Sequence, residues 1–163
     1  MKTQHGFRML QREQLLQELV HDSYKSKRKL PEPAHCPDCG AVYHHGRWTW
    51  GAAQPGSHPE VCSACHRVRD RFPAGYVTLH GDFLKSHRDE IMRRVRSCEG
   101  AEKPEHPMQR IMAIEPDGEG LLVTTTDPHL ARRIGEALHD AYKGELDFHY
   151  NKEDNLLRVS WRR

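Results

Sequence analysis

The sequence is poor in the residues that build a large core, and it has no long apolar run. Of its 163 residues, 36% are hydrophobic, 7% are aromatic and 29% are charged. No run approaches the length of a membrane-spanning helix, and residues 1–20 lack the apolar centre of a secretory signal peptide. We therefore expect a soluble, cytoplasmic protein of one ordinary domain or two small ones, without a membrane partner.

The motifs of common catalytic sites are also missing. The sequence has no Gly-rich phosphate loop, no nucleophile motif and no pair of acids on one apolar helix face. We therefore expect a non-enzymatic protein with no small-molecule substrate. Cys98 lies at helical spacing among apolar neighbours and is expected to be a small buried residue rather than a reactive thiol.

The other four cysteines form two Cys-x2-Cys pairs, and this is the most specific pattern in the chain. Cys36 and Cys39 make the first pair, Cys62 and Cys65 the second, with 22 residues between them. Two such pairs supply the tetrahedral sulfur shell that zinc prefers, in the spacing of a zinc ribbon. We predict one Zn²⁺ bound by these four thiolates, with no open position for a substrate.

Other uses of the four cysteines stay open at this point. Disulfides use the same residues, although cytosolic thiols stay reduced. Redox and iron–sulfur sites are further alternatives. A nearby histidine would replace a ligand only if one cysteine proved absent; the candidates are His35, His44, His45, His58 and His66.

Charge is unevenly distributed along the chain. Residues 1–31 carry seven Lys and Arg against three Asp and Glu, whereas residues 104–163 carry eight against eleven. A basic front on a mildly acidic back suggests that the front half meets a polyanion.

Periodicity and turn residues divide the chain into four segments of an α+β protein. Glycines and prolines separate them, and Asp127 and Pro128 are favourable residues for the start of a helix. The last segment shows the order ββαββ, which favours an antiparallel sheet with one face covered by the helix. The segments are an N-terminal helix and basic linker (1–34), a zinc-ribbon module (35–79), a long connecting helix (80–103) and a ββαββ domain (108–163).

Basic and aromatic side chains near the cysteines are candidates for contacts with nucleic acid. Arg67, Arg69 and Arg71 would point the same way in an extended backbone and match phosphate chemistry. Trp48 either stacks on a base or covers the metal site, and for Trp50 we favour packing. The full candidate set is Lys25, Lys27, Arg28, Lys29, Arg47, Trp48, Arg67, Arg69 and Arg71.

The last helix offers a further candidate docking surface. His129, Arg132 and Arg133 are expected to point away from its apolar stripe. Ion pairs with Glu136 and Asp140 on the same helix are the alternative use of these arginines.

Four segments together resemble a known family: residues 36–40, 62–65, 124–138 and 141–146. Across roughly residues 35–161 the chain resembles the amino-terminal region of the large-ribosomal-subunit nuclear-export adaptor and its archaeal homologues, as a short bacterial relative. That family binds zinc through Cys-x2-Cys pairs and clasps the intersubunit face of the large subunit near the tRNA sites. Its larger members have more zinc ligands and further carboxy-terminal domains than this sequence, so the resemblance implies ribosome binding alone.

We therefore expect a zinc-binding, ribosome-associated protein that contacts rRNA near the functional face of the large subunit. A stress, hibernation or assembly role would suit such a small protein. Two alternatives remain: a DNA-associated transcriptional regulator that uses the ribbon, and a zinc-dependent protein-interaction module.

Overall fold

The computed structural model describes Tyr24 and residues 29–163 of the chain. The expected N-terminal helix and three of the candidate basic residues, Lys25, Lys27 and Arg28, lie outside this part. The described part is an α+β structure with two mixed sheets. The α+β class expected from the sequence is therefore confirmed.

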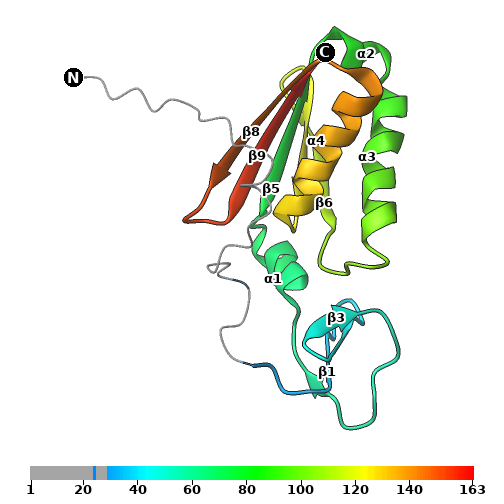
Figure 1. Ribbon diagram of the computed structural model, residues 1–163, viewed down its shortest axis with the longest axis vertical. Coiled ribbons are helices and arrows are strands. Elements are labelled where there is room, and N and C mark those ends of the chain that lie inside the picture. The colour runs from blue at the N-terminus through cyan, green and yellow to red at the C-terminus, as the bar shows by residue number, and fades with distance from the viewer. Residues whose placement is uncertain (1–23, 25–28) are drawn as a thin grey trace, which may run out of the picture.

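The first sheet belongs to the cysteine-rich module and is small. Its four strands lie in the order β3-β2-β1-β4, in which β1 pairs antiparallel with β2 and parallel with β4. The strands are β1 (Ala34–His35), β2 (Val42–His44), β3 (Arg47–Thr49) and β4 (His58–Pro59). Helix α1 (Ser63–Asp70) follows and lies between this module and the rest of the molecule (Figure 1).

The second sheet has five strands in the order β6-β7-β5-β9-β8. All neighbours pair antiparallel except β5 and β9, which run parallel. Its strands are β5 (Gly75–His80), β6 (Ile111–Asp117), β7 (Gly120–Thr125), β8 (Glu145–Asn151) and β9 (Leu156–Arg162).

Two helices cover one face of the five-stranded sheet and form the main core with it. They are α3 (Arg88–Glu102) and α4 (Pro128–Tyr142), which lie on the same side of the sheet in Figure 1. Helix α4 begins as expected, because the Asp127 side chain accepts a hydrogen bond from the His129 backbone N–H at 2.7 Å and Pro128 occupies the first turn. Fully buried side chains such as Val77, Ile134 and Trp161 fill the space between the layers.

The position of β5 corrects the expected domain boundaries. We assigned residues 35–79 to the zinc module, but β5 is the central strand of the five-stranded sheet. The prediction of a separate, fully antiparallel ββαββ domain is therefore wrong. Strand β5 lies between β7 and β9 in the sheet and pairs parallel with β9. Residues 80–103 are part of the same layer rather than a connector, because α3 packs against α4.

The prediction of a single long helix over residues 80–103 is also wrong. Helix α2 (Asp82–Ser86) ends at His87, where the backbone leaves helical geometry (φ −126°, ψ 28°) before α3 begins. The Ser86 hydroxyl donates to the Asp82 carbonyl at 3.0 Å, and such local side-chain bonds bend helices. No helix in residues 29–163 is long and apolar enough to cross a membrane.

Candidate metal centre

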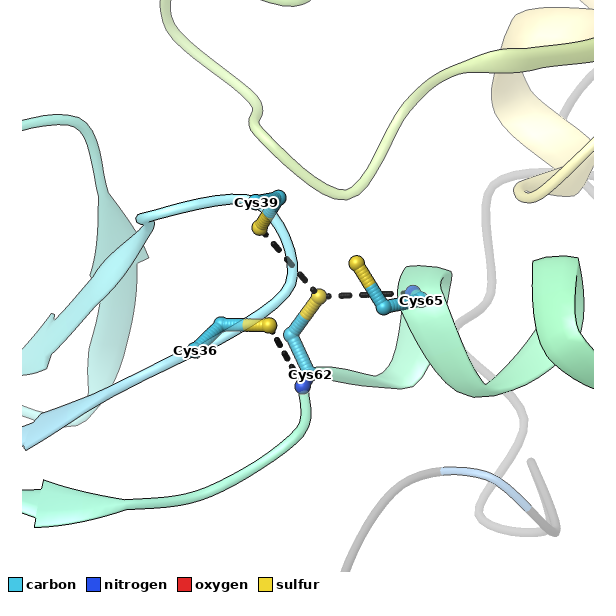
Figure 2. Close-up of side chains that lie close together, drawn as sticks. All are labelled: Cys36, Cys39, Cys62 and Cys65. Atoms are coloured by element: carbon cyan, nitrogen blue, oxygen red, sulfur yellow. Dashed lines mark hydrogen bonds between the residues drawn. The ribbon is translucent and has the colours of Figure 1, made fainter.

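The first cysteine pair sits on a tight turn after β1. The Gly40 backbone N–H donates to the Cys36 carbonyl at 2.9 Å, and the Cys36 N–H donates to the Ala41 carbonyl at 2.8 Å. Gly40 has φ +79°, a conformation that glycine adopts without the steric cost of a side chain. This turn directs the sulfurs of Cys36 and Cys39 toward the start of α1 (Figure 2).

The second pair sits at the first turn of α1. Cys62 is the N-cap of the helix, and its sulfur accepts a hydrogen bond from the Cys65 backbone N–H at 3.4 Å. The Cys62 N–H in turn donates to the Cys36 sulfur at 3.4 Å, so the two pairs are joined directly. Backbone N–H groups aimed at sulfur favour the thiolate form, which is the form that binds metal.

The four sulfurs fit a single tetrahedral metal ion. All four lie within 4.8 Å of one another, and the sulfurs of Cys39 and Cys62 are 3.8 Å apart. A zinc ion with Zn–S bonds of about 2.3 Å requires sulfur–sulfur distances of about 3.8 Å. The cluster can therefore hold one metal ion with the bond lengths of zinc after only small inward movements of the other sulfurs. No disulfide joins any cysteine in the described part.

Burial and hydrogen bonding act in opposite directions on these thiols. Burial alone would raise the pKa of Cys36, but the N–H groups of Cys62, Cys39 and Asp38 outweigh it and lower the pKa to about 7. At Cys62 and Cys65 burial dominates and raises the pKa of both thiols. A metal ion would offset this cost of burying several thiolates at one point.

One residue that the sequence analysis did not select, Arg110, completes the site. Its guanidinium group donates to three sulfurs: to Cys65 at 3.2 Å, to Cys39 at 3.2 Å and to Cys62 at 3.5 Å. Zn²⁺ with four thiolates carries a charge of −2, and Arg110 halves this charge in a largely buried place. The hydrogen bond to Cys65 and the charges of Cys62 and Cys39 outweigh burial and raise the pKa of Arg110 above its usual value.

The segment before β6 holds Arg110 in place. Its Nε donates to the Pro107 carbonyl at 2.7 Å, and its backbone N–H donates to the Thr126 hydroxyl at 2.9 Å. Met108 packs against the cysteine cluster, and its carbonyl accepts from the same Thr126 hydroxyl at 2.7 Å. The metal centre is therefore closed by side chains from the five-stranded layer. The sequence gave no sign of this contact, since Arg110 is far from all four cysteines along the chain.

Arg47 and Trp48 line a common groove of about 790 Å³ between the zinc module and α4. Trp48 is half-buried, packs against the cysteine cluster and contacts the Tyr43 ring at 5.2 Å. Trp50 is partly exposed, and its indole N–H donates to the Lys103 carbonyl at 2.8 Å. Both tryptophans thus contribute to packing, and Trp48 also presents part of its surface in the groove.

The expected row of Arg67, Arg69 and Arg71 is wrong in its geometry. The first two lie on α1, where residues two apart point in nearly opposite directions, and Arg71 ends the helix with φ 51°. Arg67 is 1% exposed, donates to the Phe72 carbonyl at 3.1 Å and lies 4.5 Å from the centre of the Tyr24 ring. It is therefore a packing residue and not accessible to a phosphate.

The remaining basic candidates near the zinc module are exposed. Arg69 makes a 2.5 Å ion pair with Asp38, which directly precedes Cys39, and so links α1 to the turn of the first cysteine pair. Lys29 and Arg71 are exposed at the surface.

On α4 the ion-pair alternative describes the arginines better than the docking prediction. Arg132 is mostly buried and pairs with Glu136 at 3.0 Å. Arg133 pairs with Glu102 on α3 at 2.6 Å rather than with Asp140.

Comparisons with protein-family models, with curated proteins and with solved structures give no match for this chain. The family resemblance therefore stays a prediction that rests on the sequence segments alone.

Proposed function

We propose that this chain is a non-enzymatic, zinc-dependent, ribosome-associated protein that contacts rRNA near the functional face of the large subunit. The observation that carries the non-enzymatic part is the closed metal centre, in which four cysteines and Arg110 occupy the space around one ion. Zinc with four protein ligands builds structure, whereas catalytic zinc keeps a position for water or substrate. Ribosome association is supported by the sequence resemblance.

In this proposal the zinc module supplies the first RNA-contacting surface. Arg47 and Trp48 combine a guanidinium group with an aromatic ring in one groove, and such a pair suits a backbone phosphate and an unstacked base. The same groove is also lined by four carboxylates, of which those of Glu102 and Glu136 are paired with arginines of α4. Lys29 and Arg71 add exposed positive charge near this module, whereas the charge of Arg69 is paired with that of Asp38. The action would be steric, since a bound protein occupies space that a tRNA or factor needs. Either a hibernation or an assembly role is consistent with this action.

Co-sedimentation of the zinc-loaded protein with purified large subunits tests the proposal. We expect binding at low salt that weakens steeply as salt rises, because phosphate contacts release counterions. R47Q should weaken binding, whereas K152Q, which removes the same charge from an exposed residue of the β8–β9 hairpin, should not. Ribosome association would be contradicted if the protein did not sediment with the large subunits, or if it bound duplex DNA as tightly as it binds the subunits.

A further inference from the structure

Three arginines gather on the exposed side of α3. Arg88, Arg93 and Arg96 lie within about 140° of arc, at 100° per residue, and all three are exposed. They line a hollow of about 480 Å³ together with Asp89. Apolar side chains from α3 and from the sheet also line this hollow, namely Met92, Ile114 and Leu121.

Within the part of the chain that the structure describes, the positive charge of this hollow is only partly balanced by acidic side chains. Within residues 29–163, no carboxylate forms an ion pair with any of the three guanidinium groups. The hollow therefore holds three positive charges against the single carboxylate of Asp89.

The other acids of α3 are engaged elsewhere. Glu90 accepts from the Tyr142 hydroxyl at 3.1 Å, Glu99 accepts from the Ile111 N–H at 3.2 Å, and Glu102 pairs with Arg133. None of these three contacts involves an arginine of the hollow.

The arginines do not have an evident role in stabilising the helix. Cations stabilise the last turn of a helix, but the last turn of α3 has no basic residue and Arg88 stands at its first position. The buried face of α3 is formed instead by Ile91, Val95 and Cys98. The three arginines thus lie outside the buried face of α3 and outside the last turn, where a cation would stabilise the helix.

We propose that this arginine hollow, formed by Arg88, Arg93 and Arg96, binds backbone phosphates of RNA as a second contact surface. The inference rests on the proposed RNA-binding function and deepens it. Guanidinium groups bind phosphate oxygens through paired hydrogen bonds, and these three span about 12 Å of helix axis. Because the arginines stand in a hollow, phosphates there are less screened by water than on a flat surface.

The test measures binding of the full zinc-loaded protein to a fluorescein-labelled RNA hairpin at several salt concentrations. We expect R93Q/R96Q to weaken binding at least tenfold and to reduce the slope of log affinity against log salt by about two. Glutamine has nearly the helix propensity of arginine, so the fold should be retained, which circular dichroism checks. K152Q/R162Q removes the same charge from the β8–β9 hairpin and should leave the affinity within about twofold.

Equal affinities of R93Q/R96Q and the wild type would overturn the inference. So would a wild-type protein that binds no RNA hairpin, or one that binds polyglutamate instead, which would assign the hollow to an acidic protein. Loss of hairpin binding in R93Q/R96Q, together with no ribosome co-sedimentation of the wild type, would reject the proposed ribosome association and retain the arginine hollow.

Discussion

The guanidinium group of Arg110 lies 3.2 Å from the sulfur of Cys65, although 44 residues separate the two in the chain. Cys65 belongs to the first turn of α1, and Arg110 directly precedes β6 of the five-stranded sheet. Their contact therefore joins the metal centre to the main core. Charge-assisted hydrogen bonds of this kind are roughly twice as strong as neutral ones. We infer that the zinc module and the five-stranded layer support each other's stability.

Replacing Arg110 should weaken both the metal site and the fold. R110A removes a charged donor from three partly buried sulfurs, which should cost about 2–4 kcal/mol of unfolding free energy and about 10–100-fold in zinc affinity. R110K keeps the positive charge but loses the several N–H donors of the guanidinium group. Its stability and zinc affinity should therefore lie between those of R110A and the wild type. Urea unfolding and competition with a chromophoric chelator measure the two effects. R162A, at an exposed arginine, is the control, and wild-type values for R110A would refute the link.

Substitution of a clustered cysteine should affect zinc binding and folding far more than substitution of Cys98. C39S or C62S breaks the shell and should abolish stable zinc binding and unfold the small sheet, since structural zinc supplies folding energy. C98A removes a buried cysteine that lies outside the cluster, and it should keep one zinc while losing about 1 kcal/mol of stability. Elemental analysis and thermal unfolding test this contrast. Zinc loss in C98A, or zinc retention in C39S, would contradict the assignment of ligands.

Proton release on zinc binding should depend on pH because of Cys36. Its pKa of about 7 lies below the ordinary 9.0, so above pH 7 this thiol has already lost its proton before zinc arrives. Fewer than four protons should be released at pH 8, and the number should rise as pH falls through 7. Calorimetric titration of metal-stripped protein in buffers of different ionisation enthalpy gives the count. A release that is the same at pH 6 and pH 8 would be inconsistent with a lowered pKa at Cys36.

Substitution of two helical glycines by alanine should change the stability of the protein in opposite directions. A Cβ at Gly135 on α4 would lie 2.5 Å from Val159 Cγ1, so G135A should destabilise the protein by about 1–3 kcal/mol through overpacking. A Cβ at Gly100 on α3 meets nothing within 4 Å, so G100A should stabilise by about 0.5–1 kcal/mol through helix propensity. Thermal unfolding of the two variants provides the comparison. Equal shifts would mean that α4 does not approach the sheet this closely.

Features set by local chemistry could be predicted from the sequence. The Cys-x2-Cys spacing requires only two short turns to bring sulfurs together, and the four cysteines do cluster. The start of α4 at Asp127 and Pro128 follows from capping alone. The order of two strands, a helix and two strands within residues 108–163 was also predicted, because each element has its own periodicity and turn residues.

Features set by distant contacts could not be predicted in the same way. The central position of β5 depends on pairing with β7 and β9, and no local pattern in a six-residue strand specifies such partners. The contact of Arg110 with the cysteines has the same character. Arg67 and Arg69 were misplaced because an alternation of basic and apolar residues was taken for a strand, whereas the Cys62 cap starts a helix.

The most direct test of the central claim is zinc X-ray absorption spectroscopy of the purified full-length protein, combined with its metal content. The account predicts one zinc per chain, surrounded by four sulfurs at about 2.3 Å and by no oxygen or nitrogen ligand. Such a closed shell is typical of structural zinc, because it leaves no position for water or a substrate. A shell with an exchangeable water or a histidine nitrogen, or a metal content near zero in undamaged protein, would contradict it.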